Sequence, residues 1–164
     1  MADQTPVQVA WVTGDLDATE RLLTALLGAR SWFRMPGVHF GPDGCTHRGA
    51  PADFVADISL SYAGDLQLEL IAPVRGDSIY AEFLAASGPG LHHICRAIPD
   101  EDAFEAALRE AGAAGAPVVT RGVMPGGMRF GYVDGAAAGV PYLEIAYIPD
   151  EIQAFFDHIK QQQQ

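Results

Sequence analysis

The sequence predicts an α+β fold made of two related halves, with a functional site between them. The first observation is a repeat, because residues 8–18 recur in the same register as residues 93–103. The second is that an amphipathic helical stretch follows each copy and ends at a glycine, Gly28 in one half and Gly112 in the other. The third is that each half closes on an apolar strand carrying a single glutamate. Two copies are too few for a solenoid, so a paired α+β module is favoured.

Hydrophobic periodicity and turn residues place the individual elements. Alternation predicts strands at 6–13, 54–63, 66–72, 91–98, 117–121, 128–134 and 140–147. Apolar spacing and glycine stops predict helices at 16–27, 79–86, 101–111 and 149–160. Asp15 is expected to cap the first helix, because its carboxylate can accept a hydrogen bond from a free N–H group of the first turn. Residues 34–52 are rich in Gly and Pro and are expected to form a loop, with a short strand around 38–40.

Composition and charge exclude several classes of partner. The formal net charge is −11 and the ten basic residues are scattered, whereas nucleic-acid binding needs clustered Lys and Arg. No apolar run approaches the length that crosses a bilayer, so no membrane partner is expected. The start of the chain does not resemble a signal peptide. Cys45 and Cys95 lack metal-type spacing, and they form either a disulfide or, more simply, two thiols in a reducing cytoplasm.

Side-chain alternation along the strands brings candidate site residues together. If the apolar strand faces pack on the helices and the sheet curls, the opposite faces line a cavity. That cavity would collect polar side chains from four strands: Gln8, Glu69 with its neighbour Gln67, His93 and Glu144. The strand at 55–62 would add the polar side chains that alternate with Ile58, Leu60 and Tyr62, namely Asp57, Ser59 and Ser61.

Each of these residues alone has an ordinary explanation. A glutamate on a strand usually faces water, and a lone histidine such as His93 is more often a satisfied core residue. Symmetry favours the joint interpretation, because Gln8 matches His93 in the repeat and Glu69 matches Glu144 at the far ends of the halves. Two glutamates and a histidine in one semi-enclosed space are unfavourable unless a cation or a proton offsets their charge. The sequence therefore predicts a divalent metal site.

Several stretches carry a family resemblance: Leu-Glu-Leu-Ile-Ala-Pro-Val at 68–74, Gly-Asp-Ser at 76–78, Phe83-Leu84 and Gly-Leu-His-His-Ile at 90–94. In these the chain resembles the vicinal oxygen chelate superfamily, which includes glyoxalases, extradiol dioxygenases, fosfomycin- and bleomycin-resistance proteins and methylmalonyl-CoA epimerase. It is most similar to the epimerase branch. The resemblance implies a single domain over 1–164, with two pseudo-symmetric βαβββ modules forming a cupped mixed sheet and helices on the outside. The parts are expected at about 6–75 (module one), 77–88 (linker helix), 90–148 (module two) and 149–160 (C-terminal helix).

The resemblance also implies a cofactor, one divalent metal ion. Carried over position by position, its ligands fall on Gln8, Glu69, His93 and Glu144. Cobalt, manganese, nickel, zinc and magnesium are the candidate ions. The first position is normally histidine in the family, and the amide oxygen of Gln8 is a weaker ligand than imidazole for borderline metals. This departure counts against extradiol dioxygenase chemistry, which resembles a two-histidine, one-carboxylate iron site.

The epimerase resemblance implies a small-molecule substrate, an acyl-CoA or a similar oxyacid ester, whose proton α to the carbonyl is removed and returned. Glu144 is the expected base, and Asp57 is the only ionisable choice for a second one on the strand at 55–62. Substrate contacts are expected from Ser59, Ser61 and Gln67.

Two other functions stay open at this point. One is a glyoxalase-type lyase acting on another carbonyl compound, and the other is a non-catalytic binding or resistance protein. The net charge of −11 fits capture of a cationic compound better than the anionic tail of CoA. A homodimer is expected by analogy with the fold.

Overall fold

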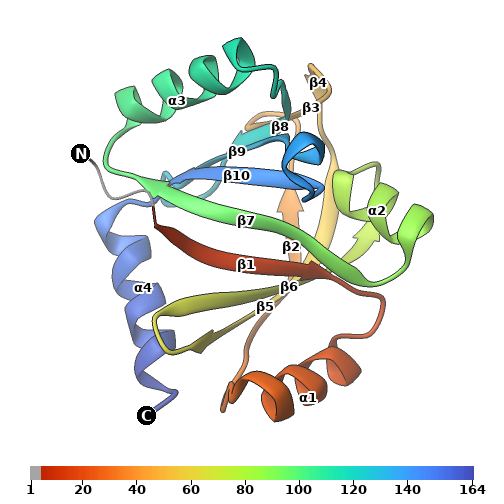
Figure 1. Ribbon diagram of the computed structural model, residues 1–164, viewed down its shortest axis with the longest axis vertical. Coiled ribbons are helices and arrows are strands. Elements are labelled where there is room, and N and C mark those ends of the chain that lie inside the picture. Colours follow the sequence, from red (N-terminus) through yellow and green to blue (C-terminus); the bar gives the residue numbers. More distant parts are fainter. Residues whose placement is uncertain (1–4) are drawn as a thin grey trace.

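The computed structural model describes residues 5–164, whose strands join into one ten-stranded sheet (Figure 1). The α-helices are α1 (Leu16–Leu27), α2 (Ile79–Ser87), α3 (Glu101–Ala113) and α4 (Asp150–Gln161). The strands are β1 (Pro6–Val12), β2 (Phe33–Phe40), β3 (Cys45–His47), β4 (Ala50–Pro51), β5 (Phe54–Ala63), β6 (Leu66–Arg75), β7 (Gly90–Ile98), β8 (Val118–Val123), β9 (Arg129–Asp134) and β10 (Tyr142–Tyr147). A short 3-10 helix lies at Ala136–Ala138.

The strand order repeats one plan in both halves. The sheet runs β2-β5-β6-β1-β7-β10-β9-β8-β3-β4, so β2-β5-β6-β1 in the first half has its counterpart in β8-β9-β10-β7. β1 is parallel to β6, β10 is parallel to β7, and the halves join where β1 runs antiparallel to β7. This confirms the predicted α+β fold with two pseudo-symmetric βαβββ modules.

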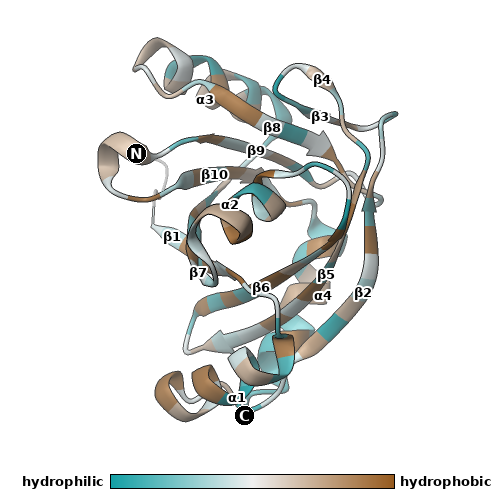
Figure 2. Ribbon diagram, turned by 90° about the vertical axis from the view of Figure 1, so that its right-hand side faces the viewer, coloured by the Kyte–Doolittle hydropathy of each residue, from teal (hydrophilic) through white to brown (hydrophobic). Residues whose placement is uncertain are grey.

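The sheet curls, because strands near its two opposite edges are joined by a short segment of the chain. Residues 41–44 alone separate β2, at one edge, from β3, which pairs with β8 towards the other edge. Figure 2 shows the resulting half-barrel, with α2 in front of it. In Figure 1, α1 and α3 lie at opposite ends of the molecule, where α1 contacts β6 and α3 contacts β7 to β10. The helix α4 contacts β5 and contributes side chains to the inside of the curl.

Local sequence signals set the ends of the helices. The Asp15 carboxylate accepts a hydrogen bond from the Ala18 N–H at 2.9 Å, and Gly28 follows α1 in the left-handed conformation with a φ of 73°. Both expectations are confirmed. The prediction that Gly112 ends the second helix is wrong, because α3 continues past it and the left-handed residue is Gly115, with a φ of 88°.

The segment at 34–52, expected to be mostly loop, contains β2, β3 and β4. β2 is an edge strand whose one partner within residues 5–164 is β5, and its register shifts between Met35 and Val38. Pro36 and Gly37 fall in that shift. An edge strand tolerates a proline that cannot donate to a ladder, and a bulge accommodates the glycine. Proline and glycine therefore mark a bulged edge strand here.

Two apolar clusters hold the sheet together. The inner cluster fills part of the curl with aromatic side chains, including Phe40, Phe54, Tyr80 and Phe130. The outer cluster packs α3 on the sheet through Phe104 and Leu108 against Val133 and Ile145. Because the inner cluster occupies only part of the curl, space remains over the central strands.

Cys45 and Cys95 are both buried and free. They are therefore the two thiols that were the simpler of the two alternatives. None of the helices within residues 5–164 is both long and apolar enough to span a bilayer.

Candidate metal centre

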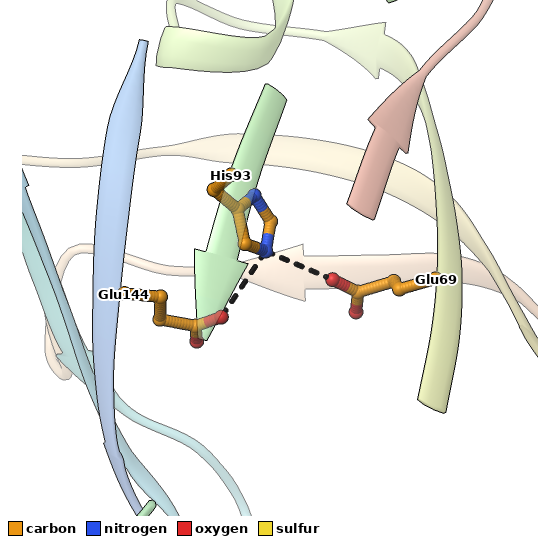
Figure 3. Close-up of side chains that lie close together, drawn as sticks. All are labelled: Glu69, His93 and Glu144. Carbon is orange, nitrogen blue, oxygen red and sulfur yellow. Dashed lines mark ion pairs between the residues drawn. The ribbon is translucent and has the colours of Figure 1, made fainter. Parts of the chain in front are cut away.

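Polar side chains from the four central strands converge inside the curl. His93 of β7 points its Nε2 atom at three oxygen atoms: Glu144 Oε2 at 3.1 Å, Glu69 Oε2 at 3.3 Å and Gln8 Oε1 at 3.3 Å. Figure 3 shows Glu69 and Glu144 reaching His93 from strands on either side of it. One ligand atom from each of Glu69, His93 and Glu144 lies within 4.8 Å of the others. The structure thus brings together all four residues expected to bind a metal.

The pairing of the strands explains this convergence. Directly paired residues present their side chains on the same face, so each row of the sheet gathers one layer of the site. One row runs Glu69–Ala10–His93, and the next runs Gln8–Cys95–Glu144. Ala10 and Cys95 are small and almost fully buried, which leaves room for the longer side chains on either side to meet above them.

Burial makes the charges of the site interdependent. Burial lowers the pKa of His93, but hydrogen bonds and charge from Glu144 and Glu69 outweigh it and raise that pKa to about 9. Burial raises the pKa of Glu69 above its ordinary value, and the charge of Glu144 raises it further, while His93 opposes both effects. Without a metal, the cluster therefore holds a proton on His93 at neutral pH.

A second histidine contacts the other side of the His93 ring. The Nδ1 atoms of His92 and His93 lie 2.9 Å apart. Burial, followed by the charge of His93, lowers the pKa of His92 to about 3, so His92 is neutral at physiological pH. A neutral His92 can accept the hydrogen bond from His93 Nδ1–H, which leaves Nε2 to face the oxygen atoms. Alternation along the strand predicts that His92 points to the face opposite His93, but the two rings are in contact.

The donor set fits a divalent cation. It offers one imidazole nitrogen, two carboxylate oxygens and one amide oxygen, a mixture suited to zinc, cobalt or nickel through the imidazole and to manganese or magnesium through the oxygens. The Nε2 atom that carries the shared proton is also the metal-facing atom of His93. Binding a cation would therefore release that proton.

Three of these four side chains, Gln8, Glu69 and Glu144, line a cavity of about 220 Å³ and form its polar floor. Gln67 also lines it, where it accepts a hydrogen bond from the Gln8 side-chain N–H at 2.6 Å and donates one to the Tyr62 hydroxyl at 2.9 Å. The walls are mostly apolar and come from β2, β5, β9, the β8–β9 turn and α4: Met35, Val38, Phe40, Ile58, Leu60, Met124, Met128, Phe130, Ile152, Phe155 and Phe156.

Three residues expected to face the cavity lie on the other side of β5. The Asp57 carboxylate accepts a hydrogen bond from the Gly37 N–H at 2.7 Å. The Ser59 hydroxyl donates to Glu20 of α1 at 2.7 Å, and Ser61 donates to a backbone carbonyl before β2 at 2.6 Å. The expectation that Asp57, Ser59 and Ser61 line the cavity is therefore wrong.

The register of the β5–β6 hairpin explains the inversion. Ala63 pairs with Leu66 across a two-residue turn, which sets Leu60 directly opposite Glu69 and on the same face. On β5 the apolar side chains line the cavity, and the small hydroxyls face outwards, where Ser59 meets α1.

A comparison with known protein families assigns the chain to a class. Residues 7–132 match the family model described as the glyoxalase/bleomycin resistance protein/dioxygenase superfamily. The chain belongs to this superfamily. No curated protein sequence matches it.

Solved structures with the same fold include methylmalonyl-CoA epimerases. The enzyme from Mycobacterium tuberculosis is 20% identical with a TM-score of 0.60, over 94% of this chain and 97% of that chain. A variant of the Streptomyces coelicolor epimerase, in complex with 2-nitronate-propionyl-CoA, is 20% identical with a TM-score of 0.60, over 88% of this chain and 94% of that one. A hypothetical protein from Bacillus halodurans C-125 is 15% identical with a TM-score of 0.61, over 90% and 96% of the two chains. At these identities the likeness extends to the fold alone.

Proposed function

We propose that this protein is a metal-dependent isomerase that moves a proton α to the carbonyl group of a small substrate. The observation that carries the proposal is the convergence of Glu69, Glu144 and Gln8 on His93 Nε2 at the floor of a cavity. These residues would hold a divalent cation, which would supply positive charge next to the carbonyl oxygen of the substrate. Membership of the superfamily and the epimerase-like fold support the proposal.

In this proposal Glu144 removes the substrate proton and returns it. Its carboxylate is buried, lines the cavity and is one of two carboxylates there. Gln67 holds the Gln8 amide through the 2.6 Å hydrogen bond, so that the Gln8 oxygen faces His93. Apolar walls exclude water from the reacting atoms.

The cavity lining favours a single proton-transfer residue over a pair. Within residues 5–164, Glu69 and Glu144 are the carboxylates that line the cavity, and both lie at its polar floor. Asp57, the residue expected to be the second base, faces away. Epimerisation by two bases needs proton carriers on both sides of the substrate, so we propose one-base isomerisation through Glu144.

Proton exchange in deuterated water tests the proposal. The protein, loaded with Mn²⁺, Zn²⁺ or Mg²⁺, is mixed with a panel of small ketones and thioesters, and α-deuterium incorporation is followed by mass spectrometry. We expect exchange that falls by roughly 10²–10⁴-fold in Glu144→Gln, the usual contribution of a positioned general base. Glu110→Gln, an exposed change on α3, is the matched control. Equal exchange in Glu144→Gln and wild type would refute the role of Glu144.

The apolar lining also favours a second candidate, a protein that binds a small apolar molecule without reaction. Tight binding from the same panel with no exchange for any compound would support this candidate and exclude the isomerase. A cytoplasmic location and a homodimer stay predictions.

A further inference from the structure

We infer that the substrate of this site is an uncharged, apolar carbonyl compound and not a CoA thioester. The inference rests on the proposed function, since it names the substrate class of the same cavity. It separates this chain from the similar structures, of which one is described as a complex with methylmalonyl-CoA and another as a complex with 2-nitronate-propionyl-CoA.

The first argument is the distribution of polarity in the cavity. Polar side chains gather at the floor, and the two hydroxyls that also line it, on Tyr80 and Tyr132, hydrogen-bond to each other at 2.7 Å. Within residues 5–164, no Lys or Arg lines the cavity. A substrate carboxylate or phosphate placed between the apolar walls would lose its hydration without gaining a cationic partner, which is strongly unfavourable. The walls therefore select an uncharged body.

The second argument is that basic side chains elsewhere are mostly occupied. Six of the ten Lys and Arg residues form ion pairs with carboxylates in the described chain, and these are Arg34, Arg48, Arg75, Arg121, Arg129 and Lys160. The protein also carries a net charge of −11. The phosphates of a CoA tail would approach a surface of like charge with few free cations to receive them. The surface thus disfavours CoA independently of the cavity.

The third argument is the size and flexibility of the lining. A volume of about 220 Å³ is below the range of roughly 300–1,000 Å³ that holds drug-sized ligands. Met124 and Met128 beside the β8–β9 turn are half-buried and line the cavity together with Phe155 of α4. Methionine side chains adapt to branched or flat apolar shapes. The site is therefore suited to a small branched or aromatic body whose carbonyl oxygen reaches the polar floor.

A matched pair of probes tests the inference. Propiophenone and propionyl-CoA share the propionyl group. Propiophenone joins it to an uncharged phenyl ring, and propionyl-CoA joins it to CoA. Binding to the full-length protein loaded with Mn²⁺ is measured by calorimetry. We expect propiophenone to bind at least tenfold more tightly. Equal or tighter binding of propionyl-CoA would overturn the inference, and so would no detectable binding of propiophenone.

A charge substitution provides the control. Met128→Lys adds a cation to the cavity lining. It should weaken the binding of propiophenone and reduce or reverse the tenfold preference for propiophenone over propionyl-CoA. Val123→Lys, at a position 41% exposed and not part of the lining, should leave both affinities unchanged. A preference that is the same in Met128→Lys and Val123→Lys would show that the cavity does not set it.

Deuterium exchange separates this inference from the proposed function. If propiophenone binds with the expected preference and exchanges its α-protons, both hold. If it binds with that preference but no compound exchanges, the isomerase proposal fails and the ligand class stands. If only thioesters exchange, the isomerase proposal stands and the inference fails.

Discussion

The proton held by His93 should make the stability of the metal-free protein fall as pH rises from neutral to alkaline. The pKa of His93 is raised from 6.5 to about 9 in the folded protein. A raised histidine pKa stabilises the folded state fully below the unfolded value of 6.5, and this contribution is lost as pH rises through about 9. The shift of about 2.5 units, at 1.36 kcal/mol per unit, corresponds to roughly 3 kcal/mol.

Urea unfolding measures this contribution directly. The free energy of unfolding of the metal-free protein is determined at pH 6, 7.5, 9 and 10, for wild type and for His93→Gln. We expect the wild type to lose about 3 kcal/mol more than His93→Gln between pH 6 and pH 10, because the variant has no imidazole to titrate. The variant also subtracts the groups outside this cluster that titrate in this range.

A bound divalent cation should remove this difference in pH dependence between the wild type and His93→Gln. The metal binds neutral His93, so a saturated protein no longer gains stability from protonating that ring. Excess metal at 100 times its dissociation constant should also stabilise the folded protein by about 2.7 kcal/mol. The reasoning is refuted if the metal-free wild type and His93→Gln show parallel pH profiles, since the ring would then not hold a stabilising proton.

Three further predictions follow from the geometry. Ala10→Leu fills the space between Glu69 and His93. The free energy of unfolding in urea should therefore fall by about 1–3 kcal/mol, and metal affinity measured by calorimetry should fall with it. Unchanged metal binding would contradict the packing argument. Asp57→Asn should leave α-proton exchange within twofold of wild type, because the side chain faces away from the cavity, and a tenfold loss would restore Asp57 as a candidate base. Gly76→Ala should lower the free energy of unfolding in urea by more than about 1 kcal/mol. The reason is that Gly76 has a φ of 81° and an added Cβ would lie 2.2 Å from the Asp53 backbone oxygen. Unchanged stability would show that the turn relaxes freely.

Features that depend only on neighbouring residues in the chain are predicted correctly from the sequence. The Asp15 cap and the Gly28 stop of α1 appear where expected, because a capping hydrogen bond and a left-handed glycine need only the local chain. The Pro36–Gly37 stretch was misread as loop, because only the pairing of β2 with β5 shows that a bulged edge strand can hold these residues. At Gly112 the glycine lies inside the last turn of α3, which ends at Ala113.

The face of each strand was predicted from hydropathy, which worked for β6 and failed for β5. On β6 the polar residues Gln67 and Glu69 do line the cavity. On β5 the same rule predicts that Asp57, Ser59 and Ser61 point inwards, because it takes the interior of the curl to be the polar side. That interior is polar only at its floor.

By itself, the sequence determined the duplicated α+β plan and the three residues, Gln8, Glu69 and Glu144, that meet at His93. Both follow from the repeat, because equivalent positions in two similar modules must lie in equivalent places about their common axis. Only the tertiary structure decided which face of β5 points inwards, that His92 contacts the His93 ring, and that the walls of the cavity are apolar. These features depend on strand register and on the curl of the sheet, which bring together side chains far apart in the chain and leave no local pattern in it.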